Sequence, residues 1–275
     1  MKRTLSVNLL AIFCLTGLAL KPISLPAQSI WLRRSPEKTI AIEVLKPNFA
    51  GEFNTTFLTS AAFLSTRIPL NKKLVFVGEL PFANGGIDYQ LGRLASGGTV
   101  GNPYLGLEIR QPTSSVFAEI GVRLPLAAEN NFGAVVGTRT DFDRADAFID
   151  HTLTVNVLMN YLEKDASNLF FRLRLGAAFL NNIQGRLGTS VNLLYSGQIG
   201  YEVDPFNVIV GLSGRWNVSE GFSGFGLRAS HQFGVAASVR LGVVQPGLLF
   251  RLPVDEILNE AVDYVVGLHL GIDWR

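Results

Sequence analysis

Hydrophobic and polar side chains alternate one by one along much of this chain. Phe171, Leu173 and Leu175 share one face of their segment, while Arg172 and Arg174 share the other. A helix cannot separate neighbours in this way, whereas successive side chains of a β-strand point to opposite faces. The same parity recurs in many segments of similar length, and it predicts an all-β protein.

Twelve strands are predicted from this pattern, with ten and fourteen as the alternatives, since bacterial barrels usually have an even number. We place them at 38–46, 56–69, 73–82, 103–111, 115–126, 148–162, 169–180, 190–203, 206–217, 229–241, 247–254 and 262–274.

The connections between these strands sort by length. Those after strands two, four, six, eight and ten are short, whereas 83–102 and 127–147 are the longest and fall on the opposite rim. Tight periplasmic turns and larger outer loops are typical of outer-membrane barrels, and a soluble sandwich has no reason to sort its loops. The pattern therefore predicts an up-and-down antiparallel barrel with both termini on the periplasmic side.

The N-terminal region has the form of a secretory signal peptide. Lys2 and Arg3 precede a mostly apolar stretch, and small residues before Gln28 suit cleavage after Ala27. We expect a signal peptide at 1–27, a short periplasmic segment at 28–37 and an outer-membrane barrel at 38–275. The alternative is an N-terminal membrane anchor.

Cleavage after Ala27 changes what composition allows. It removes Cys14, the single cysteine, so the mature chain has no disulfide and no thiolate metal site. It also removes three of the 24 basic residues and none of the 22 acidic ones, so the mature net charge is 21 − 22 = −1. This near-neutral chain argues against nucleic-acid binding. After the signal no apolar run reaches 18 residues, so a membrane-embedded form requires a closed barrel.

Charged side chains within the strands fall mostly on the face predicted to line the lumen. Outward charge at the middle of the bilayer costs about 2–4 kcal/mol for Arg or Lys. The lumen-lining candidates are Glu79, Glu108, Arg110, Glu119, Arg123, Arg172, Arg174, Glu202, Arg215, Arg240, Arg251 and His269. These residues either select solutes or stiffen the barrel as ion pairs, and the second role is favoured for any single one.

Aromatic residues near strand ends on the opposite face predict two interfacial girdles. The candidates are Phe82, Tyr161, Phe171, Phe179, Tyr201, Phe206, Trp216, Tyr264 and Trp274.

Motifs of catalysis do not appear in the sequence. There is no GxSxG, HExxH or phosphate-binding loop, and we predict no enzyme, no catalytic residue, no cofactor and no metal site. Ser230 and His231 are neighbours on one strand and face opposite ways, so they cannot easily bond. Parity places His151 and His231 outward and His269 inside.

Two stretches resemble the outer-membrane barrels grouped as phenol-degradation MetA-pathway proteins. Gly101-Asn102-Pro103 matches the family's entry to a strand, and Leu124-Pro125 matches the first half of its Leu-Pro-Thr-Gly-like turn, with Leu126-Ala127 replacing the second half. The stretch 78–86 also fits, so about fifty residues are covered. The resemblance implies a transporter-like barrel that passes aromatic or other small hydrophobic molecules.

The sequence thus predicts a channel of the cell outer membrane for small molecules of unknown identity, hydrophobic or aromatic ones included. One alternative is a lumen-plugged structural or adhesion barrel acting through its outer loops. Another is a lipid-modifying enzyme, which needs a nucleophile and a base at the lipid face. Expected partners are outer-membrane lipid and the barrel-assembly machinery, which commonly reads a terminal aromatic residue; here Trp274 is penultimate.

Overall fold

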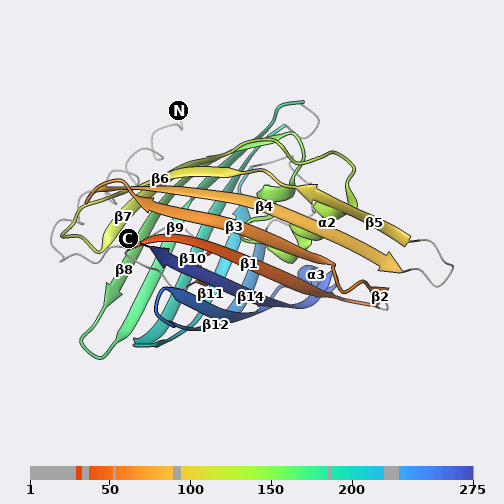
Figure 1. Cartoon of the computed structure of the whole chain (residues 1–275). Helices are drawn as coiled ribbons and strands as arrows, with labels where there is room; N and C mark the ends of the chain where they lie inside the picture. The colour runs from red at the N-terminus through yellow and green to blue at the C-terminus, as the bar shows by residue number, and fades with distance from the viewer. Residues whose placement is uncertain are drawn as a thin grey trace, which may run out of the picture.

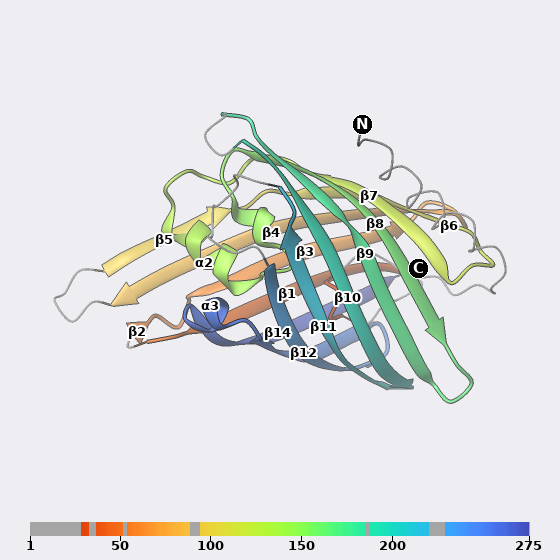
Figure 2. The same cartoon turned by 180° about the vertical axis from the view of Figure 1, so that it is seen from behind.

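The computed structural model shows a closed antiparallel barrel of twelve strands (Figures 1 and 2). It describes residues 29–32, 37–51, 54–88, 94–184, 188–219 and 229–274. The barrel strands are β1 (Lys38–Phe49), β3 (Ser60–Pro69), β4 (Leu74–Asp88), β6 (Tyr104–Arg110), β7 (Val116–Arg123), β8 (Thr152–Lys164), β9 (Leu169–Asn182), β10 (Thr189–Val203), β11 (Phe206–Asn217), β12 (Ala229–Val239), β13 (Val244–Pro253) and β14 (Val262–Trp274).

The ring closes at two places where the strands are not consecutive in the sequence. β1 pairs with β14 from Lys38↔Trp274 onward, and β4 pairs with β6 between Leu74↔Ile109 and Glu79↔Tyr104. The fold class and the strand number predicted from the alternation are therefore confirmed. Among the described residues, no helix is both long and apolar enough to cross a bilayer.

Side chains alternate between the outer wall and the interior. Leu173 and Leu270 on the outer wall are 56% and 41% exposed, whereas Asn207 and Asp273 on the inner face are 2% and 6% exposed. A water-soluble barrel would place these apolar side chains inside, so the outer surface is suited to hydrocarbon.

Three predicted strand starts differ from the structure by three residues or more. The strand expected at 56–69 begins at Ser60, because 56–59 forms a turn in which Thr59 hydrogen-bonds to Gly86. The strand expected at 148–162 begins at Thr152, after a short 3₁₀ helix, η1 (Ala145–Phe148), and His151 with φ of 48°. The strand expected at 247–254 begins at Val244.

The connection expected as a long loop at 83–102 is largely strand. β4 runs on to Asp88 and pairs there with β5 (Leu94–Val100), while the short β2 (Asn54–Thr55) pairs on its other side. These elements form a hairpin arm that projects beyond the barrel wall at the end opposite the C-terminus (Figure 1). This arm extends the wall of the barrel.

Two helices lie toward the same end of the barrel as the arm (Figure 1). α2 (Phe132–Thr140) belongs to the long connection between β7 and β8, and α3 (Glu256–Asn259) lies between β13 and β14. α2 packs against β4 and β5 and also reaches β3, β1 and β14, which are adjacent strands on one side of the barrel (Figure 2). This position shows that the β7–β8 connection folds into the mouth of the barrel.

Candidate functional site: a plugged lumen

The β7–β8 connection enters the barrel as a packed unit. Asn131 caps α2 by accepting the backbone N–H of Gly133 at 2.8 Å, which satisfies one of the free donors of the first turn. Gly137 of α2 lies against the ring of Phe148, where an added Cβ would come within 2.5 Å. Phe148 in turn meets Phe63 of the barrel wall edge-on, with ring centroids 5.8 Å apart. The connection is thus fixed to the inner wall.

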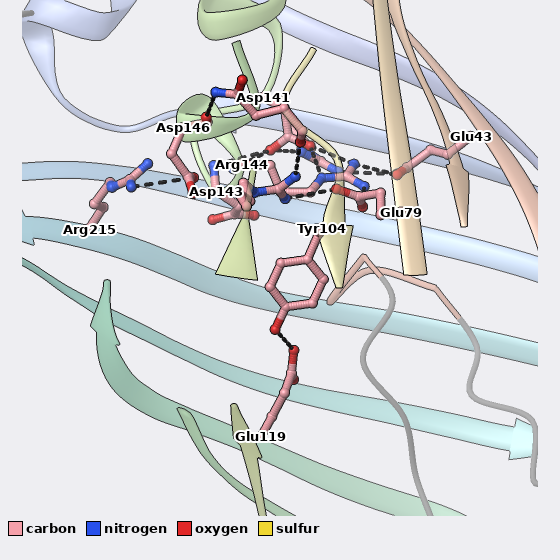
Figure 3. A network of polar contacts seen from close by, with 12 residues as sticks. Glu43, Glu79, Tyr104, Glu119, Asp141, Asp143, Arg144, Asp146 and Arg215 are labelled. Carbon is pink, nitrogen blue, oxygen red and sulfur yellow. Dashed lines mark hydrogen bonds and ion pairs between the residues drawn. The ribbon is translucent and has the colours of Figure 1, made fainter. Parts of the chain in front are cut away.

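Arg144, which follows α2, binds acids from three parts of the chain. Its guanidinium lies 2.6 Å from Asp141 and 2.8 Å from Glu79, and it also donates to Glu43 (Figure 3). The same guanidinium lies 3.5 Å from the centroid of the Phe63 ring. Arg144 therefore joins the inward connection to strands β1, β3 and β4.

Three arginines of the barrel wall complete this network. Arg251 lies 3.2 Å from Glu43 and 2.9 Å from Asp141. Arg123 lies 2.7 Å from Glu79 and 3.2 Å from Asp146, which also accepts from Arg215 at 3.4 Å. We call these eight side chains the plug network: Arg123, Arg144, Arg215, Arg251, Glu43, Glu79, Asp141 and Asp146.

The charges of the plug network balance, four against four. All eight side chains are at most 11% exposed, so none is solvated as a surface charge would be. Burial of such charges is costly, and it is tolerated when each ion has several well-placed partners. The network therefore specifies where the inward connection sits.

A second segment, residues 29–32, also lies inside the lumen. Trp31 is 1% exposed and donates its indole N–H to Asp143 at 3.0 Å. Arg172 donates to the carbonyl oxygens of Ile30 and Leu32 at 3.3 and 3.0 Å, and Ser29 donates to Glu43 at 3.1 Å. We expected 28–37 to be a periplasmic segment, but the hydrogen bonds to the inner wall hold 29–32 inside the barrel.

The inner wall makes room for the indole at one position. Gly234 of β12 lies under Trp31, where an added Cβ would come within 2.6 Å of the ring. The guanidinium of Arg251 lies 5.8 Å from the Trp31 ring centroid. Residues 29–32 thus share Arg251 and Glu43 with the plug network, and the two segments form one plug.

Of the twelve lumen-lining candidates, Glu79, Arg123, Arg215 and Arg251 belong to the plug network, and Arg172 holds residues 29–32. Glu108 pairs with Arg67 at 3.5 Å, and both side chains are fully buried. Glu119 accepts from Tyr104 at 2.5 Å and lies 3.8 Å from Arg174. Arg110 and His269 also lie on the inner face.

The last two candidates lie away from the plug network. Glu202 pairs with Lys164 at 3.8 Å, and Arg240 lies 3.9 Å from Asp204 in the short β10–β11 turn, with its side chain 36% exposed. Their positions near the short-turn rim explain this, because a side chain at a strand end reaches water. Sequence reasoning missed Glu43, Arg67, Trp31 and the acids of the inward connection.

The girdle candidates lie on the outer wall. Phe82, Phe171, Phe179, Tyr201, Phe206, Trp216 and Tyr264 are between 37% and 56% exposed, while Tyr161 and Trp274 are half-buried.

Among the described residues, a small cavity lies beside the plug. This cavity of about 80 Å³ lies between Glu79, Tyr104, Glu119, Arg123 and the inward connection. By volume it accommodates a few water molecules and no larger solute. The described residues of the plug therefore fill this part of the lumen.

Comparison with solved structures places the fold among outer-membrane barrels. The COG4313 outer membrane channel from Pseudomonas putida F1 matches over 90% of this chain and all of its own, with a TM-score of 0.58 and 14% identity. The translocator domain of the autotransporter NalP from Neisseria meningitidis matches over 86% of this chain and 89% of its own, with a TM-score of 0.54 and 8% identity.

LpxR from Salmonella typhimurium matches over 86% of this chain and all of its own, with a TM-score of 0.50 and 11% identity. No family model and no curated protein matches the sequence. The fold is thus that of bacterial outer-membrane proteins, a group with diverse roles, and the resemblance to the MetA-pathway family stays a prediction.

Proposed function

We propose that the protein is an outer-membrane channel for small molecules, seen here with its lumen closed by a movable plug. The observation that carries the proposal is the plug network inside a closed barrel. A lumen filled only to stiffen the barrel would be served by apolar packing, which costs no desolvation of charge. When the plug moves away from the wall, water can solvate the separated charges of each ion pair. A charged contact between plug and wall can therefore become a water-filled passage.

The composition of the interior supports the same proposal. Asn156, Asn160 and Gln198 line the inner wall, and each is at most 6% exposed. Once the plug moves, these side chains would line a polar path. The resemblance to phenol-degradation proteins makes small aromatic molecules the first solutes to test.

The test compares channel conductance with and without the plug. Purified protein in planar bilayers should give small or rare current steps, and replacing 127–147 by a short glycine-serine linker should enlarge them several-fold. Arg240→Met is the matched control, since this arginine lies outside the plug network. Liposome swelling with solutes of increasing size then measures the width of the path.

A folded variant that lacks 127–147 and still seals the bilayer would contradict the proposal. Heat-modifiable migration on a denaturing gel shows whether that variant has folded. The alternative, a structural or adhesion barrel, would then hold, and one specific observation favours it: the arm of β4 and β5 projects beyond the wall. Deleting the tip of that arm would then abolish partner binding without changing conductance.

A further inference from the structure

Three side chains with acid–base chemistry meet on the outer wall, outside the lumen. The Tyr195 hydroxyl oxygen lies 2.5 Å from His231 Nε2, and His231 Nδ1 lies 2.9 Å from Asp255 Oδ1. Asp255 also accepts the backbone N–H of His231. Because a carboxylate faces Nδ1, the imidazole carries its proton there, and Nε2 accepts the proton of the phenol.

The strand register explains how these residues come together. Tyr195 of β10 lies opposite Gly214 of β11, and Gly214 lies opposite His231 of β12. An added Cβ at Gly214 would come within 2.4 Å of the Tyr195 ring. A glycine between them thus lets the two rings approach to 5.8 Å between centroids.

The neighbouring residues place this group at the outer boundary of the apolar wall. Trp216, 49% exposed, lies two residues from Gly214 toward the outer rim, and Leu212, 53% exposed, lies two residues toward the middle of the wall. Exposed tryptophans of barrels lie at the membrane interface. Acyl chains join lipid headgroups at this depth, so an ester carbonyl can reach the group.

The side chains are also open to the surroundings. The His231 side chain is 38% exposed and that of Asp255 is 27% exposed. Since the group faces away from the lumen, solute passage through the barrel makes no use of it. A nucleophile next to a base that a carboxylate orients is the arrangement needed for acyl transfer.

We propose that Tyr195, His231 and Asp255 form a hydrolytic site for ester-linked acyl chains of outer-leaflet lipid. The Tyr195 oxygen attacks the ester carbonyl carbon while its proton passes to His231 Nε2. The bond between the carbonyl carbon and the lipid alcohol oxygen breaks, and the imidazolium gives its proton to that oxygen.

Water completes the cycle. His231 takes a proton from water as the water oxygen attacks the acyl carbon on Tyr195, and the proton then returns to the phenolate. The products are a free fatty acid and the lipid alcohol, and Tyr195 is regenerated. Asp255 is a positioning residue that holds the imidazole and stabilises its charged form.

The first test measures the reactivity of Tyr195 directly. An apolar aryl sulfonyl fluoride transfers its sulfonyl group to an activated phenol with loss of fluoride, and peptide mass spectrometry locates the adduct. Tyr201 is an internal control, because it lies on the same face of the same strand, is 46% exposed, and has Val208 and Leu169 beside it instead of a histidine.

At neutral pH, Tyr195 should react about tenfold faster than Tyr201 or more, as expected for assistance by a base. His231→Gln and Asp255→Asn should lower that rate to the rate of Tyr201. Equal labelling of the two tyrosines in the unmodified protein would overturn the proposal.

The second test measures the reaction on lipid. The folded full chain is reconstituted in vesicles of lipopolysaccharide or of diacyl phospholipid, two arms that distinguish the lipid sources, and released fatty acid is measured by mass spectrometry. Release should occur in at least one arm, fall to background in Tyr195→Phe and His231→Gln, and persist in Ser230→Ala, which changes the neighbour on the other face. Equal release from Tyr195→Phe would show that the three residues only anchor 254–261 to the wall.

Discussion

Trp31 donates its indole N–H to Asp143 over 3.0 Å, although 112 residues separate them in the sequence. One residue lies just after the expected signal peptide, and the other lies in the connection between β7 and β8. Because of this contact, neither segment can move away without breaking a hydrogen bond to the other. The plug is therefore a single unit formed by two segments that are far apart in the sequence.

Truncating this indole should loosen the plug. Trp31→Ala removes a fully buried side chain, so we expect a loss of about 3–5 kcal/mol of unfolding free energy and a rise in conductance. Trp31→Phe keeps most of the apolar contact and loses one hydrogen bond, so it should cost about 1 kcal/mol. Guanidinium unfolding in vesicles, followed by the fluorescence of the two other tryptophans, measures both; equal losses would show that the ring's packing contributes nothing.

Removing one ion of the plug network should cost more than removing a rim ion. Arg144→Met leaves three buried carboxylates short of a partner, and breaking a buried pair in this way costs about 3–5 kcal/mol. Arg240→Met at the exposed rim should cost about 0–1 kcal/mol. The difference between the two midpoints of unfolding is the observable, and similar values would contradict burial of Arg144 in the plug network.

The barrel was predictable because outward and inward side chains alternate along its spanning strands. The final strand shows this well, since 262–274 was predicted and observed with the same limits. Glu43 has inward parity in the first strand, so the same rule could have added it to the lumen candidates. Predicted strand boundaries were wrong where a turn stands in place of the strand, as at His151.

The plug was not predictable from its own residues. The stretch from Asp141 to Asp146 is polar and has the composition of a solvent-exposed loop. Only the charged inner wall makes its burial favourable, and that wall exists only after twelve strands have closed. The outer-wall group of Tyr195, His231 and Asp255 was not predictable either. It depends on the register between strands, which the alternation of side chains does not determine.

Acid should weaken the plug over a defined range. Burial alone would raise the pKa of Asp141, but Arg144 and Arg251 outweigh it and lower the pKa to about 2, from an ordinary value of 3.8. A lowered folded-state pKa stabilises the protein above the ordinary value, and this contribution is lost as pH falls toward about 2.

Conductance should therefore stay low from neutral pH down to about 4 and increase below it. Asp141→Asn removes this titration, so its conductance should already be raised at neutral pH and should change less between pH of about 4 and 2. An identical pH profile in both proteins would assign the change to other carboxylates.

If hydrocarbon surrounds the barrel, a charged substitution on the outer wall should be costly. Leu173 lies outward in β9 and is 56% exposed, while Leu241 lies in the short β12–β13 turn and is 61% exposed. In water the two leucines are equivalent surface residues. In a membrane, Leu173→Arg should cost about 2–4 kcal/mol and Leu241→Arg about 0–1 kcal/mol, because the penalty falls toward the interface. Unfolding of both variants in vesicles measures this difference, and equal costs would contradict burial of the outer wall in lipid.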